Sequence, residues 1–305
     1  MKEAATEPLT ATRGLPAMPL LSTLSIRWRW PALALLGAAL MAGCASLEEQ
    51  QRKLIFMPSP ASQRYAAKSA GMDDVWIKLQ SAETGKPVRL HALWLAHPDP
   101  AAPVLLFLHG ARRSVEDSAF RIRNMRALGF AVLAVDYRGF GQSSEELPSE
   151  AMVYEDARAA WAWLAQQHPQ RDRYIFGHSL GGAIAVQLAS EVGDENGLKG
   201  LIVEGSFTSI PDVFKTMRWG WLPVGALITQ RFDAADKIAR VKAPVLVVHG
   251  DSDTLIRPEL GRQLFERASA PKRFVLVEGG THYNTNSVAR AQYRDALQAL
   301  FGLRS

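Results

Sequence analysis

The stretch Tyr174-Ile-Phe-Gly-His-Ser-Leu-Gly-Gly182 decides which fold this chain adopts. Residues 174–176 are apolar and predict a buried strand, and the apolar run 182–188 predicts a helix. Between them, Gly177 and Gly181 enclose Ser179 in a Gly-x-Ser-x-Gly pattern. Glycines at these places allow a sharp, strained turn that lifts a serine hydroxyl above the edge of a sheet. The pentapeptide alone is a weak signal, but its position between a strand and a helix makes Ser179 the predicted nucleophile.

Short β-branched runs alternate with segments of helical period on both sides of this stretch. The predicted strands are 75–79, 88–94, 104–108, 130–135, 173–176, 201–203, 245–248 and 274–277. The predicted helices are 114–128, 153–164, 180–192, 258–269 and 287–301. The first two strands should form an antiparallel hairpin at the start of the sheet. The alternation after them predicts an α/β fold, with a mostly parallel central sheet and helices on both faces.

A serine nucleophile needs a base, and the base needs an acid that orients it. His282 follows the last predicted strand and is the predicted base. His249 ends the strand 245–248 and is expected to support the loop that carries the acid. Two acids in that loop, Asp251 and Asp253, compete for the role. The alternative for Asp251 is a turn residue that caps the backbone.

Acyl transfer also needs two backbone N–H groups that bind the oxyanion. Leu180, directly after the serine, is one predicted donor, and Ala111, in the turn after strand 104–108, is the other. Arg112 and Arg113 follow in this turn, and they either favour substrates with an anionic group or are simply solvated.

The segment 206–243 interrupts the alternation and is predicted to form a small cap. It is rich in apolar side chains, which predict a compact acyl pocket over the site. They are Phe214, Met217, Trp219, Trp221, Leu222, Val224, Leu227 and Ile228.

Composition excludes several other classes of protein. The chain has 305 residues, 48% of them apolar and 21% charged, which is not the composition of a disordered or collagen-like protein. Its net charge is +5, but no run of five basic residues occurs, so no nucleic-acid partner is predicted. One cysteine and seven histidines without a His-Glu-x-x-His pattern predict neither a metal nor any other cofactor.

The N-terminus reads as a targeting segment. Arg27 and Arg29 precede the uncharged stretch 30–43, which as a helix would span only about 21 Å of a ~30 Å hydrocarbon core. A basic start, a short apolar middle and small residues at the end predict a signal peptide over residues 1–43. The alternatives are an uncleaved membrane anchor or a buried Cys44 in an ordinary apolar segment. Met18 is a second candidate translation start.

Leu40-Met-Ala-Gly-Cys44 resembles the lipobox of bacterial lipoproteins, although Met41 stands where that family usually has Leu. The resemblance implies that Cys44 carries fatty acyl chains such as palmitate. Because Ala45 is not Asp, it also implies the periplasmic face of the outer membrane in a bacterial cell envelope. Residues 44–73 would then be an anchor-proximal linker, and 74–305 the catalytic domain.

The remaining segments resemble the α/β-hydrolase family, specifically its anchored ABHD-type serine hydrolases. The resemblance runs from about residue 51 to the C-terminus, and these segments carry it: 51–56, 107–110, 136–143, 177–182, 206–209, 221–224, 249–253 and 280–282. It implies that Asp253, the third residue after Gly250, is the acid, and that Asp136 orders a loop near the mouth of the site. One departure is Ala111, because the family usually has Asn there.

The resemblance implies a serine hydrolase that cleaves small carboxylic esters or thioesters through a Ser179–Asp253–His282 triad and an acyl-enzyme. A serine peptidase or amidase of the same fold is the first alternative. A binding protein without catalysis is the second, although no member of the triad is missing.

Overall fold

The computed structural model describes residues 43, 45–61, 65–193, 197–269 and 271–303. One compact unit covers Glu48–Ser305, and Met1–Leu47 forms a separate one. Cys44 and the predicted signal peptide, except Gly43, lie outside the described residues. Within the described part of the chain, no helix is both long and apolar enough to cross a membrane.

The centre of the larger unit is an eight-stranded sheet in the order β1-β2-β4-β3-β5-β6-β7-β8. Its strands are β1 (Asp73–Gln80), β2 (Pro87–Leu95), β3 (Val104–Leu108), β4 (Ala131–Val135), β5 (Arg173–His178), β6 (Leu198–Glu204), β7 (Val245–Gly250) and β8 (Lys272–Val277). β2 pairs antiparallel with both β1 and β4, and the other pairs are parallel. The predicted strands and the predicted fold class are confirmed.

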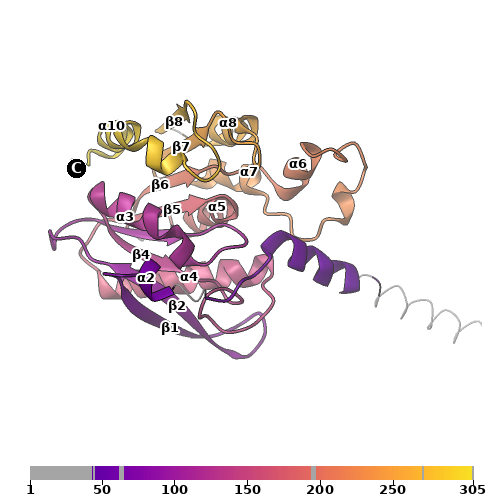
Figure 1. Ribbon diagram of the computed structural model, residues 1–305, viewed down its shortest axis with the longest axis horizontal. Helices are drawn as coiled ribbons and strands as arrows, with labels where there is room; N and C mark the ends of the chain where they lie inside the picture. The colour runs from indigo at the N-terminus through magenta and orange to yellow at the C-terminus, as the bar shows by residue number, and fades with distance from the viewer. Residues whose placement is uncertain (1–42, 44, 62–64, 194–196, 270, 304–305) are drawn as a thin grey trace, which may run out of the picture. The chain divides into compact units, whose positions relative to one another are not determined.

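Helices cover both faces of the sheet (Figure 1). The longer ones are α3 (Ala119–Ala127), α4 (Glu150–Gln167), α5 (Leu180–Val192), α8 (Pro258–Arg267) and α10 (Arg290–Phe301). Shorter ones are α2 (Tyr65–Lys68), α6 (Ile210–Lys215), α7 (Ala234–Lys237) and α9 (Thr285–Val288), with 3-10 turns η1 (Val115–Ser118), η2 (Gly225–Leu227) and η3 (Ile238–Arg240). α4, α5 and α8 pack on one face, and α3 and α10 on the other, because each turns its apolar stripe to the sheet.

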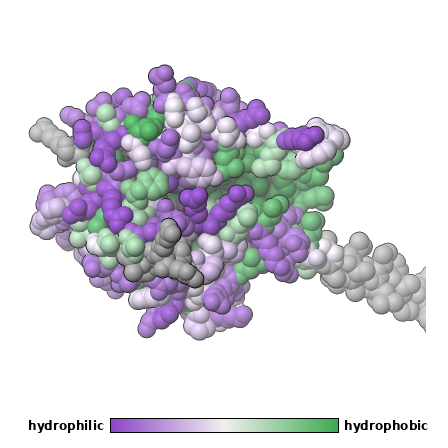
Figure 2. Space-filling view, viewed as in Figure 1, coloured by the Kyte–Doolittle hydropathy of each residue, from purple (hydrophilic) through white to green (hydrophobic). Residues whose placement is uncertain are grey.

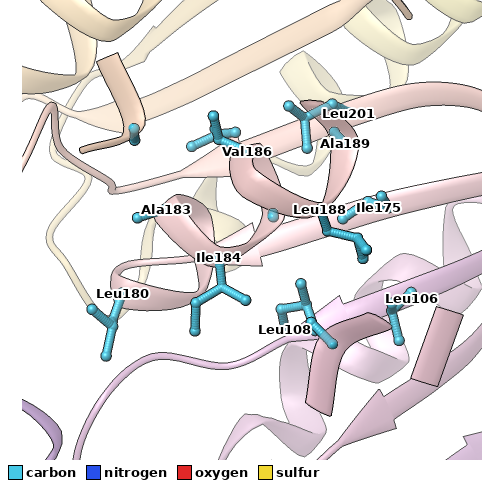
Figure 3. Close-up of a cluster of buried hydrophobic side chains, with 14 of the residues drawn as sticks. Leu106, Leu108, Ile175, Leu180, Ala183, Ile184, Val186, Leu188, Ala189 and Leu201 are labelled. Atoms are coloured by element: carbon cyan, nitrogen blue, oxygen red, sulfur yellow. The ribbon is translucent and has the colours of Figure 1, made fainter. Parts of the chain in front are cut away.

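The helix that follows Ser179 is the most deeply buried of them. Most residues of α5 are buried, and this helix is apolar nearly all round because it packs on the sheet and also against α4 and α7. Figure 3 shows Ile184 and Leu188 of α5 beside Leu106 and Leu108 of β3. This packing holds the start of α5, and with it Ser179, firmly above the sheet.

The predicted cap segment contains α6, η2, α7 and η3. At its base, the N–H of Ile210 donates to the carbonyl of Arg231 over 2.8 Å, and the N–H of Arg231 donates to Glu150 over 2.7 Å. Four of its large apolar side chains, Met217, Trp219, Trp221 and Leu227, are exposed. The prediction that this cluster forms an acyl pocket is wrong for these four, because they face solvent instead of the body.

Residues 45–56 form a helix within the segment predicted as a linker. From Glu48 onward this helix belongs to the same compact unit as the sheet. Arg52 donates from Nε to the carbonyl of Pro148 over 2.9 Å, and Phe56 at the helix end is fully buried. The N–H of Arg112 donates to the carbonyl of Phe56 over 2.9 Å, so this helix supports the turn after β3.

Candidate active site

Ser179 lies in the turn between β5 and α5 with a backbone that only a constrained turn holds. Its φ of 57° and ψ of −123° are unusual for a residue other than glycine. A Cβ on Gly181 would lie 2.2 Å from the carbonyl oxygen of Leu108, and a Cβ on Gly177 would lie 2.2 Å from that of Gly181. Glycine is therefore required at both places, which explains the pattern found in the sequence.

The structure brings Ser179, His282 and Asp253 together at the carboxyl ends of β5, β8 and β7. His282 Nε2 lies 3.0 Å from Ser179 Oγ, and His282 Nδ1 lies 2.8 Å from Asp253 Oδ2. His282 and Asp253 are buried, whereas Ser179 is partly exposed. An ionised carboxylate only accepts hydrogen bonds, so Nδ1 carries the proton and Nε2 is free to accept the serine proton.

The surroundings of Asp253 keep its carboxylate charged. Burial by itself would raise the pKa, but hydrogen bonding to His249 and His282 outweighs burial and holds the pKa of Asp253 well below its ordinary value. The N–H groups of Leu255 and Ile256 donate to Oδ1 over 3.0 and 2.9 Å and fix the orientation of the carboxylate.

The competing acid has a different environment. Asp251 is exposed, and its Oδ1 accepts hydrogen bonds from the N–H of Gly279 and from Ser252 Oγ. His249 donates from Nε2 to the carbonyl of Ile256 over 2.9 Å, within the loop that carries Asp253. The arrangement therefore joins Asp253, and not Asp251, to His282, while His249 supports the loop.

The segments that contain the two predicted oxyanion donors lie next to the serine. Leu180 is the first residue of α5, directly after Ser179. The turn that holds Ala111 passes close to the serine, since a Cβ on Gly110 would lie only 3.0 Å from Ser179 Cβ. Two backbone N–H groups near the serine are what an oxyanion hole requires.

A buried network of hydrogen bonds and ion pairs supports the loop of His282. The sequence did not predict this network. Arg121 of α3 donates from Nε to Glu204 Oε1 over 2.9 Å. Its Nη2 lies 3.1 and 3.2 Å from the carbonyl oxygens of His282 and Tyr283. Glu204 also accepts from the hydroxyl of Tyr293. The sequence shows Glu204 at the end of an apolar strand and Arg121 within the helix after η1, but it does not show that the two meet.

His178, next to the serine, also belongs to this network. Its Nε2 lies 3.0 Å from the carbonyl oxygen of His282 and 3.1 Å from Arg121 Nη2. Burial, and then the charge of Arg121, hold the pKa of His178 well below its ordinary value. The imidazole is therefore neutral in the folded protein at neutral pH.

Asp136, at the end of β4, binds η1 and β2 through its side chain. Its Oδ1 accepts from the N–H of Val115 over 2.8 Å, and its Oδ2 lies 3.3 Å from His91 Nδ1. The guanidinium and backbone of Arg138, two residues later, bind Asp156 of α4. These contacts fix the loop to the helix layer.

Arg112 and Arg113 are both exposed. The guanidinium of Arg113 lies 5.2 Å from the ring centre of Tyr283, the residue directly after His282.

Two surface hollows of about 420 and 200 Å³ are lined by residues other than the triad, one along β1 and β2 and one at the base of the cap. Among the described residues, no group of three or more His, Cys, Asp and Glu side chains is arranged to hold a metal.

The sequence was compared with known proteins. A family model described as serine aminopeptidase, S33, matches residues 99–231. "Alpha/beta hydrolase domain-containing protein WAV2" of Arabidopsis thaliana is 30% identical over 274 residues, which are 82% of this chain and 86% of that protein. "Lysophosphatidylserine lipase ABHD12" of Danio rerio is 30% identical over 185 residues, 56% of this chain and 48% of that protein. The chain therefore belongs to the α/β-hydrolase family, and it is a hydrolase.

Solved structures share the same architecture. The Pyrococcus furiosus esterase Pf2001 aligns with a TM-score of 0.61 at 18% identity, over 80% of this chain and 98% of its own. Est1E of Butyrivibrio proteoclasticus with bound ferulic acid aligns with a TM-score of 0.61 at 19% identity, over 75% of this chain and 99% of its own. At this level of identity the likeness is one of fold.

Proposed function

We propose that the chain is a serine hydrolase that cleaves carboxylic ester or thioester bonds through an acyl-enzyme. One observation carries the proposal: the hydrogen-bonded line from Ser179 Oγ through His282 to Asp253 at the carboxyl edge of the sheet. Its members follow in the chain order Ser, Asp, His, which is the order of α/β-hydrolases. The names of one relative, a lipase, and of one structural neighbour, an esterase, agree with this chemistry.

Each group would have a defined role. Ser179 Oγ attacks the acyl carbon while its proton passes to His282 Nε2, and Asp253 stabilises the resulting imidazolium. The N–H groups of Ala111 and Leu180 would bind the oxyanion. The protonated His282 then gives its proton to the leaving alcohol or thiol. Water attacks the acyl-enzyme by the reverse sequence, with His282 again as base, and releases the acid.

A fluorophosphonate probe and an ester panel test the proposal. Ser179→Ala should abolish labelling and lower ester turnover about 10³-fold or more, because triad members act as a unit. Ser190→Ala removes a half-buried serine of α5 whose hydroxyl donates to the carbonyl of Gln187, and this matched control should label like the wild type. Labelling that persists in folded Ser179→Ala protein would refute the role of Ser179, and a wild type that is never labelled would favour a binding protein.

A peptidase or amidase is the second candidate, because the matching family model is described as serine aminopeptidase. Aminoacyl nitroanilides assayed beside esters and thioesters of the same acyl group separate the two. Faster turnover of the nitroanilides would replace the ester proposal with this one.

We further propose that residues 1–43 are a signal peptide and that acyl chains such as palmitate on Cys44 hold the protein at the outer membrane. The basis is the lipobox-like sequence before Cys44. Cells fed an alkyne analogue of palmitate should label the wild type but not Cys44→Ser. Unmodified Cys44 in the mature wild type would contradict the anchor.

A further inference from the structure

The outermost part of the cap, residues 214–229, exposes large apolar side chains where a soluble protein normally buries them. We call this segment the cap tip. Trp221 is 73% exposed, Leu227 59%, Trp219 56% and Met217 52%. Figure 2 shows an apolar area on this side of the molecule, over the segment between α6 and α7. An apolar patch of this kind on a monomer marks a surface that contacts something else.

The main chain of the cap tip forms short turns with hydrogen bonds between nearby residues. Backbone N–H groups donate to the carbonyl three residues earlier, each over about 3 Å: Met217 to Phe214, Gly220 to Met217, Leu222 to Trp219 and Leu227 to Val224. These short turns satisfy the backbone locally, so the side chains are free to face outward. The exposure is thus built into ordered turns of the chain.

The helix 45–56 lies against the cap tip and adds to the patch. Gln51 donates from Nε2 to the carbonyl of Leu227 over 2.7 Å and accepts from the N–H of Thr229 over 2.8 Å. Leu54, one turn later on the same side of this helix, is 74% exposed. Leu54 and the four apolar residues of the cap tip form what we call the tip patch.

The cap tip carries positive charge of its own, and Arg218 is its main source, because Lys215 pairs with Asp212 over 2.9 Å and the helix with Leu54 has as many acidic as basic residues. Residues 214–229 contain Lys215 and Arg218 and no acidic residue. The guanidinium of Arg218 lies 5.5 Å from the ring centre of Trp219, so a cation lies at the patch itself. Tryptophan, which has an apolar ring and a polar N–H, combined with basic side chains suits the boundary between lipid headgroups and acyl chains.

We propose that the tip patch inserts into the surface of a bilayer that contains anionic lipid. The position of the patch along the chain selects this occupant. Only nine residues lie between Cys44 and Leu54, and the uncharged stretch 30–43 ends just before Cys44. Either a lipid on Cys44 or an uncleaved membrane anchor formed by the stretch 30–43 would bring a membrane next to the helix that carries Leu54. The proposal does not depend on the reaction that the site catalyses.

A single fluorescent label tests the insertion directly. Cys44 is the only cysteine, so the full chain with Cys44→Ser accepts one new cysteine at a chosen place. Trp221→Cys and, separately, Leu227→Cys are labelled with nitrobenzoxadiazole, whose emission brightens and shifts to the blue in an apolar environment. Leu276→Cys on β8, also an exposed apolar position but outside the cap, is the matched control.

Vesicles of phosphatidylcholine with phosphatidylglycerol should brighten the label at 221 and 227 and leave the label at 276 unchanged. Arg218→Gln should weaken binding to these vesicles about fivefold, as expected for about 1 kcal/mol per basic residue, and should not affect vesicles of phosphatidylcholine alone. The proposal is wrong if lipid leaves the labels at 221 and 227 unchanged, or affects all three positions equally. It is also wrong if these labels brighten with protein concentration alone, which would assign the patch to a second copy of the chain.

Discussion

Arg121 is the residue that links the body of the protein to the loop of the catalytic-base candidate. Its guanidinium holds the carbonyls of His282 and Tyr283 and is paired with Glu204 inside the protein. Breaking one partner of a buried ion pair costs about 3–5 kcal/mol. We therefore expect Arg121→Met to lower both the free energy of unfolding, measured with urea, and kcat.

A double variant distinguishes two roles of Arg121, which either positions the loop of His282 or only stabilises the fold. Adding Glu204→Gln to Arg121→Met removes the charge of Glu204, which Arg121 no longer neutralises, and should recover part of the stability. The kcat should stay low, because the carbonyl of His282 still lacks the hydrogen bond from Arg121. Arg123→Met, an exposed arginine of the same helix, should change neither. Full recovery of kcat in the double variant would mean that Arg121 serves stability only.

His178 should make the protein sensitive to acid. Its pKa is lowered in the folded state, so below its ordinary value of about 6.5 the unfolded chain binds a proton that the folded protein excludes. Stability is therefore lost as the pH falls through this value. We expect the wild type to lose about 1.4 kcal/mol more than His178→Gln between pH 7.5 and about 5.5. Urea unfolding of both proteins at each pH measures this, and equal losses would contradict it.

At the scale of elements, the junction of β5 and α5 decides whether the site forms. Gly181 allows α5 to start directly against the end of β3. A methyl group there would meet the Leu108 carbonyl at 2.2 Å and the His109 carbonyl at 2.5 Å. We expect Gly181→Ala to destabilise the protein by about 1–3 kcal/mol or more and to lower kcat, because the helix must move together with Ser179.

Gly225→Ala is the control for this prediction, since no atom lies within 4 Å of a Cβ built there. Its stability should stay within about 0.5 kcal/mol of the wild type. Thermal unfolding and ester turnover of the two variants give the comparison. An active, stable Gly181→Ala protein would show that the junction tolerates a side chain.

At the scale of the whole molecule, the helix 45–56 connects the cap, the loop before α4 and the turn after β3. Phe56 is fully buried, packs edge-on against Phe232, and its carbonyl accepts from Arg112. Phe56→Ala should cost about 3–5 kcal/mol in unfolding free energy and lower kcat through this turn. Leu54→Ala, two residues earlier and exposed, should unfold like the wild type. Equal stability of the two variants would show that the helix is dispensable.

The local pattern of the sequence determined the strands, the helices and the turn around Ser179. Hydrophobic period and glycine placement depend on neighbours in the chain, so they can be read without the fold. Ser179 and His282 each follow a predicted strand. Because parallel strands bring their carboxyl ends to one edge of the sheet, the sequence predicted that the two residues meet there. The choice between Asp251 and Asp253 needed the resemblance to a family.

Only the tertiary structure decided what depends on contacts between distant segments. The meeting of Arg121 with Glu204 joins residues 83 positions apart. The support of the Arg112 turn by Phe56 and the outward direction of Trp221 likewise depend on how elements pack. Apolar residues at helical spacing in the cap predicted burial, but burial requires a facing surface, and the described part of the chain provides none for Met217, Trp219, Trp221 and Leu227. The sequence shows which side chains are apolar, whereas the packing of distant segments determines which of them are buried.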